Sequence, residues 1–139
     1  MVSAAMGASQ ALFPTEASLA APFDVAIEVS GNPLALQTAI DSTRKGGRII
    51  VGSWYGDEDI MLRLGTDFHR SHKTLQTSQV SEIAAELSHT WTKGRRFALA
   101  WELVRTLRPS RLLTKKATLS TAQGAFEALE NGQEVAIAF

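Results

Sequence analysis

The sequence predicts an α/β fold with a parallel sheet, and three patterns carry this prediction. Residues 23–29 (FDVAIEV) form an apolar, β-branched run that predicts a strand. Residues 33–44 place apolar side chains at helical spacing, and residues 47–53 form a second apolar run of strand length. A strand, a helix and a strand within about 30 residues are typical of a βαβ unit, whose two strands run parallel.

The ends of this predicted helix have chemical signals of their own. Asn32 is suited to cap the helix, and Pro33 suits the first helical position because its missing N–H is not needed there. The pair Gly46-Gly47 is predicted to stop the helix. The same pair could be taken for a phosphate-binding loop, but it lies between a helix end and a strand start, which favours the stop.

The remaining elements are predicted from shorter patterns. Gly7 is expected to close the tail of a helix over residues 1–8. Further strands are predicted at residues 10–13, 60–64, 73–80 and 134–139, and helices near Phe68, at 95–107 and in the segment after Ser120. Pro109 is expected to end the first of the long helices. Ser120 and Gln123 predict a capping box at the start of the last helix, and Asn131-Gly132 predicts its end. The predicted apolar face of this helix consists of Ala122, Ala125, Phe126 and Leu129.

Composition limits the function classes. The 139 residues carry no net charge, so no global field attracts nucleic acid or an anionic membrane, and neither partner is expected. No cysteine is present, which excludes disulfides and thiolate metal sites and fits a cytoplasmic location. No signal peptide or membrane span is predicted.

One basic segment, Lys93–Lys116, departs from this balance. It contains eight lysine and arginine residues and a single acid, Glu102. A nucleic-acid footprint is one interpretation. Because the residues bracket an amphipathic helix, a solvated helix face is favoured, and phosphate recognition from a cofactor remains a third alternative.

A family resemblance is carried by four segments in order. Residues 24–56 read DVAIEVSGNPLALQTAIDSTRKGGRIIVGSWYG, which resembles the fourth strand, the following helix and the fifth strand of the coenzyme domain in medium-chain dehydrogenase/reductases. Residues 5–17 (AMGASQALFPTEA) look like the stretch after that domain's glycine-rich βαβ unit. Residues 68–81 look like the approach to its sixth strand, and residues 107–139 are similar to the return into its catalytic domain.

The resemblance implies a more specific fold. It is a partial Rossmann fold, a doubly wound parallel sheet lacking its first βαβ unit, with a C-terminal helix and strand returning to the catalytic domain. The implied domains are residues 1–108, a partial NAD(P)-binding domain, and residues 109–139, a piece of the catalytic domain. NAD or NADP is the implied cofactor, and ligands of such sheets lie beyond the carboxyl ends of the strands.

The implied cofactor-binding residues follow the ends of three strands. They are Ser30, Gly31, Val51, Gly52, Ser53, Ser78, Gln79 and Val80. Gly31 and Gly52 suit such a site because a residue without a side chain lets backbone groups approach a ligand closely. No catalytic and no metal-binding residue is carried over.

The departures from the family pattern weaken the implied site. No G-x-G-x-x-G motif and none of the family's zinc-binding cysteines occur in the sequence, and Gln133 and Glu134 stand where relatives can place a basic residue. Cofactor binding by this chain alone is therefore expected to be weak or absent, and zinc is not expected. The chain is expected to be a truncated form that is not catalytically competent alone.

Two function classes remain open. The first is part of an NAD(P)-dependent, zinc-type alcohol or polyol dehydrogenase, an oxidoreductase. The second is a non-catalytic binding or assembly module that uses an exposed sheet edge. In both cases the expected partner is a second copy or a missing N-terminal half.

Three smaller patterns allow both a functional and a structural interpretation. Asp67, His69 and His72 form D-x-H-x-x-H, for which surface or packing histidines are favoured over a metal site. Glu28 lies in an apolar strand, and a structural carboxylate with satisfied hydrogen bonds is favoured over a catalytic one. Trp54 and Tyr55 would either line a substrate pocket or pack in a core or interface.

Overall fold

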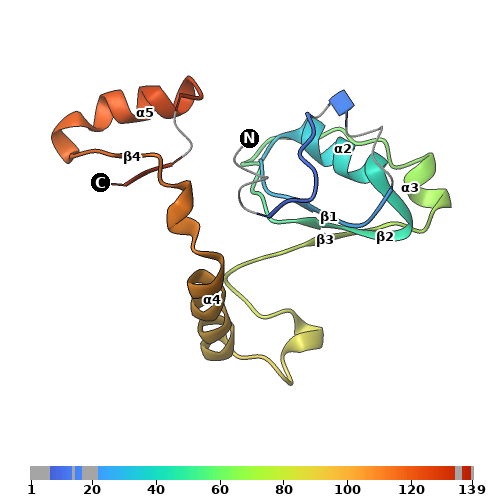
Figure 1. The fold of residues 1–139 in the computed structure, drawn as a ribbon. Helices are drawn as coiled ribbons and strands as arrows, with labels where there is room; N and C mark the ends of the chain where they lie inside the picture. Colours follow the sequence, from blue (N-terminus) through green and yellow to red (C-terminus); the bar gives the residue numbers. More distant parts are fainter. Residues whose placement is uncertain (1–6, 14, 17–21, 134–135, 139) are drawn as a thin grey trace. The chain divides into compact units, whose positions relative to one another are not determined.

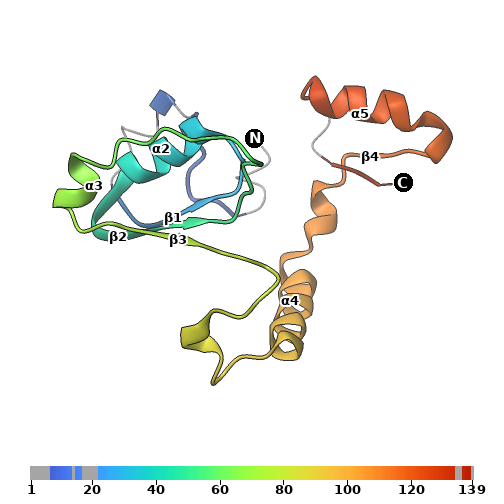
Figure 2. The same cartoon turned by 180° about the vertical axis from the view of Figure 1, so that it is seen from behind.

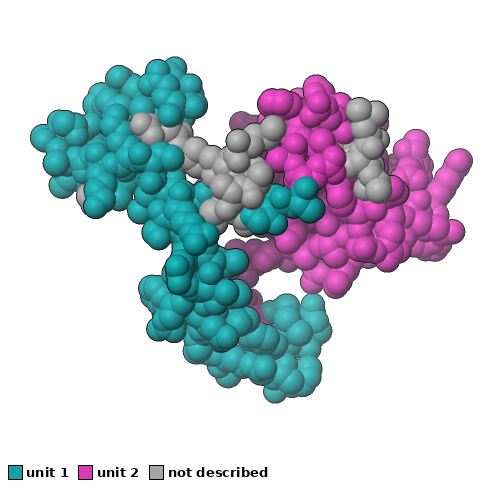
Figure 3. All heavy atoms as spheres, in the orientation of Figure 1, with its two compact units in different colours: residues 1–9, 84–139 teal, residues 10–83 magenta. Residues whose placement is uncertain are grey.

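The structure is a computed structural model, and it describes residues 7–13, 15–16, 22–133 and 136–138. The chain divides into two compact units, shown in Figure 3. Unit 2 is Gln10–Ile83, and unit 1 is Met1–Ser9 with Ala84–Phe139. The division after residue 108, between a partial NAD(P)-binding domain and a piece of a catalytic domain, stays a prediction.

Unit 2 contains a three-stranded parallel sheet (Figure 1). Its strands are β1 (Phe23–Glu28), β2 (Thr43–Val51) and β3 (Thr74–Thr77), in the order β1-β2-β3. In the register, Ile27 pairs with Ile50 and Ile50 with Gln76. Helix α2 (Pro33–Ser42) connects β1 to β2. The predicted strand–helix–strand unit and its parallel direction are confirmed.

Helix α2 begins as the sequence predicts. Asn32 is the N-cap, its side-chain oxygen accepts from the amide N–H of Leu34 at 2.9 Å, and Pro33 occupies the first helical position. Leu36 and Ile40 of this helix pack with Ile49 of β2, and these three side chains form the buried core of the unit. Full burial of one such side chain contributes roughly 1.5–3 kcal/mol, so this small core holds α2 against the sheet.

The predicted end of α2 is wrong. The helix ends at Ser42, because Thr43 is already extended (φ −87°, ψ 137°), and the Thr43 hydroxyl donates to the carbonyl of Ala39 at 2.6 Å. Gly46 and Gly47 lie instead in an irregular part of β2, between the register positions of Thr43 and Arg48. Gly46 has φ +70°, and a Cβ on Gly47 would lie 2.9 Å from the Asp24 carbonyl oxygen. The bulge therefore requires glycine at these two positions, for its backbone conformation at Gly46 and for lack of space at Gly47.

Two predicted strands are absent from unit 2. Residues 10–13 form no strand; the amide of Phe13 donates to the Glu16 carboxylate and the amide of Glu16 to the Phe13 carbonyl, both at 2.9 Å. Residues 60–64 also form no strand. There the Arg63 amide donates to the Gln37 side chain at 2.8 Å, so side chains of α2 hold this segment in place of a ladder. The helix predicted for residues 1–8 falls mostly outside the described residues.

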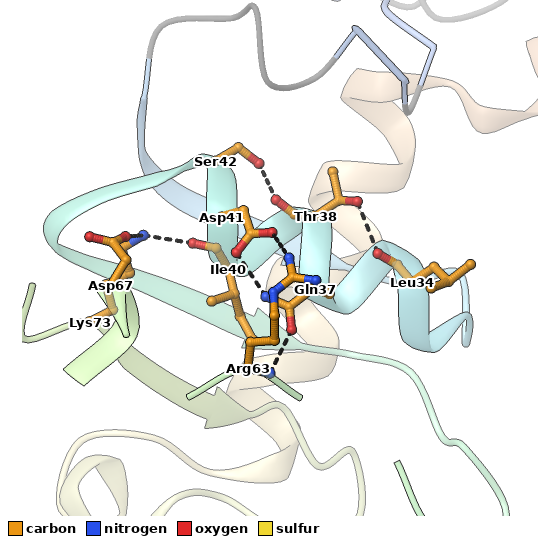
Figure 4. A network of polar contacts seen from close by, with 9 residues as sticks. All are labelled: Leu34, Gln37, Thr38, Ile40, Asp41, Ser42, Arg63, Asp67 and Lys73. Carbon is orange, nitrogen blue, oxygen red and sulfur yellow. Dashed lines mark hydrogen bonds and ion pairs between the residues drawn. The ribbon is translucent and has the colours of Figure 1, made fainter. Parts of the chain in front are cut away.

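Short elements connect β2 to β3. The predicted helical piece near Phe68 is confirmed as α3 (Asp67–Arg70), and β3 occupies only four residues of the predicted 73–80 segment. Figure 4 shows how this region meets α2: the buried Lys73 ammonium donates to the Ile40 carbonyl at 2.8 Å and forms an ion pair with Asp67 at 2.5 Å. An ammonium buried in this way needs both partners to offset its lost hydration.

Unit 1 is built from local elements, which Figure 2 shows from behind. Its long helix is α4 (Lys93–Leu107), where the Thr92 side chain accepts from the Arg95 amide at 3.1 Å. Arg108 adopts a left-handed conformation just before Pro109, so the predicted helix and its end are confirmed. The other elements are η2 (Ala85–Leu87), η3 (Pro109–Leu112), β4 (Lys115–Lys116), η4 (Leu119–Thr121), α5 (Ala122–Glu130) and β5 (Ile137–Ala138), with β4 and β5 paired in parallel.

The last helix is confirmed, but its predicted start is wrong. The capping box is formed by Thr118 and Thr121 at the start of η4, while Gln123 donates to Glu127 at 2.9 Å within the helix. A 3₁₀ turn before α5 moves the cap upstream of Ser120. The end is as predicted, because Gly132 (φ +67°) follows the last turn.

The predicted apolar face of α5 needs one correction. Ala125 is buried, but the second buried position is Ala128, and Phe126 is 55% exposed. The terminal strand is confirmed at Ile137–Ala138; residues 134, 135 and 139 lie outside the described residues. Over the part of the chain that is described, no helix is long and apolar enough to cross a membrane.

Candidate functional site

The carboxyl ends of β2 and β3 form a cleft of about 490 Å³ in unit 2. Its lining residues are Val51, Gly52, Ser53, Trp54, Thr77, Ser78, Gln79 and Val80. Six of the eight residues proposed from the sequence are among them. The two strands are neighbours in the sheet, so residues separated by about one fifth of the chain come together at one edge.

The cleft walls are extended by backbone hydrogen bonds beyond the strands. The Ser78 amide donates to the Val51 carbonyl, and the Gly52 amide donates to the Glu28 carbonyl, both at 2.8 Å. A Cβ on Gly52 would lie 3.1 Å from a methyl group of Val29. Glycine at this position therefore allows the segment after β2 to pack against the segment after β1. This structural reason differs from the one inferred from the sequence, which is close approach of the backbone to a ligand.

Ser30 and Gly31 do not line the cleft but support it from the end of β1. Gly31 has φ +71°, a left-handed conformation that favours glycine. Its amide N–H is 2.8 Å from the Ser53 hydroxyl oxygen and 3.2 Å from a Glu28 carboxylate oxygen. Because this N–H already has acceptors within the protein, Gly31 positions Ser53 and is not an open donor.

Glu28 is the polar centre behind the cleft. It is 4% exposed, and one of its oxygens accepts from the Ser30 amide at 2.5 Å and the Ser30 hydroxyl at 2.6 Å. The other oxygen accepts from the hydroxyl of Tyr55. The favoured interpretation of Glu28, a structural carboxylate with satisfied oxygens, agrees with this geometry. It joins the turn after β1 to the chain after β2.

These contacts decide the protonation of the pair. Burial by itself would raise the pKa of Glu28, but hydrogen bonds from Ser30, Tyr55 and Ser53 outweigh it and lower the pKa from 4.5 to about 2. Burial and the Glu28 charge raise the pKa of Tyr55 to about 12. At neutral pH Glu28 is therefore ionised and Tyr55 neutral, and neither is poised for proton transfer.

A pH dependence of stability follows from Glu28. Its pKa is lower in the folded chain than in the unfolded chain, so its contribution is fully present above pH 4.5 and is lost as the pH falls towards 2. We expect Glu28→Gln to lower the free energy of unfolding at pH 6 and to approach the wild type near pH 2. Urea unfolding at several pH values measures this.

The control for this experiment is Glu58→Gln, a change at an exposed acid. It should leave the acid dependence of unfolding as in the wild type. If Glu28→Gln kept the full wild-type loss of stability between pH 4.5 and 2, the carboxylate would not be the source of that loss.

Sequence reasoning missed part of this site. Thr77 lines the cleft as the last residue of β3, and its place directly before Ser78 is the signal that could have indicated it. Trp54 lines the cleft and is 85% exposed, whereas Tyr55 packs against the core. The two aromatic residues, treated together in the sequence, thus have different roles.

In the D-x-H-x-x-H segment, the aspartate makes contacts that stabilise the local structure. Asp67 accepts from the Ser71 hydroxyl at 2.7 Å and pairs with Lys73, whose hydrogen bond is the largest cause lowering the Asp67 pKa. Within the described ranges, no group of three or more histidine, cysteine, aspartate or glutamate side chains is placed to hold a metal ion.

Comparison with solved structures supports the assignment of the fold. The chain is similar to a thermostable alcohol dehydrogenase from Pyrobaculum aerophilum that was solved with cobalt and zinc. The two share 23% sequence identity, and the match covers 99% of this chain and 39% of that chain at a TM-score of 0.69. The 2R,3R-butanediol dehydrogenase from Bacillus subtilis matches with 20% identity over 93% of this chain and 35% of that chain, at a TM-score of 0.59. An alcohol dehydrogenase from Thermotoga maritima matches with 19% identity, 91% and 34% coverage and a TM-score of 0.62.

This chain has the fold of part of an alcohol dehydrogenase. It spans between a third and two fifths of the length of these three relatives. The resemblance to medium-chain dehydrogenase/reductases, and with it the partial Rossmann fold, is confirmed as a statement about the fold. No family model matches the sequence, and no curated protein matches it significantly.

Proposed function

We propose that this chain supplies the nicotinamide side of an NAD(P) cleft in a zinc-type alcohol or polyol dehydrogenase, an oxidoreductase. The observation that carries the proposal is the cleft at the carboxyl ends of β2 and β3, in a fold shared with alcohol dehydrogenases. In open parallel sheets, ligands bind at this end of the strands.

The lining residues fit a nicotinamide and its ribose. The cleft volume lies within the usual range of small-molecule sites, about 300–1,000 Å³. Ser53, Ser78 and Gln79 offer hydroxyl and amide groups for a ribose or carboxamide. Gln79 uses its side-chain oxygen to accept from the Ser81 amide at 2.7 Å, which orients its NH₂ group as a donor. Trp54 adds an exposed apolar ring at the rim.

When bound, the cofactor supplies hydride transfer, and the protein supplies its orientation. In this chain Glu28 contributes to that orientation. Its carboxylate accepts from the amides of Ser30 and Gly31, and the Gly31 amide also donates to the Ser53 hydroxyl oxygen. The glycine-rich motif that places a pyrophosphate on a helix N-terminus does not occur in these 139 residues. The part of the cleft formed by this sequence therefore lacks the strongest anchor of a dinucleotide.

We expect the 139-residue chain to bind NADH weakly, with a Kd on the order of 1 mM, and to show no alcohol-dependent reduction of NAD or NADP and no bound zinc. Titration followed by amide NMR shifts should affect Val51–Ser53 and Ser78–Val80. Absorbance at the reduced-cofactor band and elemental analysis measure turnover and zinc.

Ser78→Trp should block the cleft and abolish these NMR shifts, while Thr106→Trp on the exposed surface of α4 is the matched control. Shifts that survive Ser78→Trp, or that lie outside the two segments, would place the ligand elsewhere. Turnover or stoichiometric zinc that follows the purified protein would contradict the expectation of an inactive chain.

A second function, a binding or assembly module, is favoured by the surface of β1. Phe23, Val25 and Ile27 alternate along this strand and are all exposed, and Val29 follows the strand at 75% exposure. Among the described residues β1 pairs only with β2, so its other edge has no ladder partner there. Such an edge and an apolar face recruit another chain. The partner proposed is a second copy or an N-terminal half, in the cytoplasm.

A further inference from the structure

We propose that the amino-terminal end of the sheet in unit 2 carries a phosphate-binding site, formed by the Phe68–Lys73 segment and the bulge of β2. This site lies at the opposite end of the strands from the candidate cofactor cleft. It is independent of the proposed dehydrogenase function.

The first observation is a hollow of about 460 Å³ with a basic lining. The lining residues are Phe68, His69, Arg70, His72 and Lys73. Four of the five carry a cationic or imidazole side chain. Arg70 and His72 are exposed at the surface, while the ammonium of Lys73 is buried below it, with 1% of its side chain accessible.

The second observation is that a backbone hydrogen bond joins the bulge to this segment. The Gly46 amide donates to the Ser71 carbonyl at 2.7 Å, which places Lys45 beside the loop that carries Arg70. Arg48 pairs in register with Thr74, directly after the hollow. Basic residues of β2 and of the segment before β3 thus lie at the same end of the sheet.

The third observation is that the acids of this region already have partners. Asp67 pairs with Lys73, and Asp24 pairs with Arg44. Among the described residues, no ion pair is found for Lys45, Arg48 or Arg70. The local charge is therefore positive, although the whole chain is neutral, and a phosphate would meet little opposing charge.

The loop backbone is also held in an uncommon form. His72 has φ +50°, which is rare for a residue with a side chain. Its amide donates to the His69 carbonyl, and the Lys73 amide donates to the Phe68 carbonyl, both at 3.3 Å. These bonds fix a tight turn, and both Arg70 and His72 of this turn line the same hollow.

The ligand class is a phosphate group of a small molecule. The hollow has the volume of a small-ligand site, and arginine binds phosphate through paired N–H donors. An extended nucleic-acid backbone would need a longer basic track, with several phosphate contacts. The phosphate could be inorganic or part of a phosphorylated metabolite, and the chemistry at the protein is the same.

The test uses the 139-residue chain and inorganic phosphate at constant ionic strength, with phenyl phosphate as a monoester and a single-stranded oligonucleotide as comparison probes. We expect saturable amide shifts confined to residues 44–48 and 68–73 with both phosphate probes. Arg70→Gln should weaken binding at least tenfold. His72→Asn, which tolerates the left-handed backbone, should also weaken it.

Arg111→Gln, at an exposed arginine of η3, is the matched control and should bind as the wild type does. Unsaturable shifts, shifts spread over all exposed basic residues, or an unchanged affinity in Arg70→Gln with intact amide dispersion would overturn the proposal. Binding of the oligonucleotide alone, without binding of either phosphate probe, would also overturn it.

Discussion

Replacing Ile49 with alanine is expected to destabilise unit 2 by about 2–5 kcal/mol, the usual cost of truncating a buried aliphatic side chain to alanine. Ile49 is fully buried, and with Leu36 and Ile40 it forms the core that joins α2 to the sheet. Three side chains share this role, so the loss of one removes a large fraction of the core. Urea unfolding followed by circular dichroism measures the effect.

The matched control is Ile50→Ala, one residue along the same strand. Ile50 is only partly buried, because successive side chains of a strand point to opposite faces of the sheet. We expect a clearly smaller loss for Ile50→Ala, and about 0.5–1.5 kcal/mol for Ile49→Val. Equal losses for the two alanine variants would mean that α2 does not pack against this face as the structure has it.

Self-association is the second large effect that we expect. Burying exposed apolar surface contributes roughly 25 cal/mol per Å², so a few hundred Å² around β1 would contribute several kcal/mol to association. The open edge of β1 adds unpaired backbone groups that favour strand pairing. Sedimentation at micromolar concentration should therefore show dimers or larger assemblies of the 139-residue chain.

Ile27→Lys places a charge on the exposed face of this strand and should shift the chain towards monomer. Met61→Lys changes a side chain that is 96% exposed and lies outside β1, and it should not alter the association. A compact wild-type monomer under these conditions would contradict the proposal that β1 recruits a second copy. Equal effects of both variants would indicate a general charge effect.

Much of the candidate site could be predicted because it follows strand ends. In a parallel sheet, the carboxyl ends of neighbouring strands meet at one edge, so Val51–Ser53 and Ser78–Val80 could be placed together once the strands were assigned. The role of Glu28 could not be fixed in the same way. Its partner Tyr55 is 27 residues away, and only the packing of the two strand ends brings the carboxylate and the hydroxyl together.

The sequence by itself determined the βαβ unit, its capped helix start and the parallel direction of β1 and β2, because these depend on local propensity and on periodicity. At residues 10–13 and at the end of α2, hydrogen bonds within four residues, Phe13 with Glu16 and Thr43 with Ala39, replaced the predicted arrangement. Only the tertiary structure decided the bulge at Gly46-Gly47 and the absence of a strand at residues 60–64. In these two places a contact between distant segments, Asp24 against Gly47 or Gln37 with Arg63, outweighed a local pattern. Contacts between distant segments cannot be predicted from a local sequence pattern, because they form only when the chain folds.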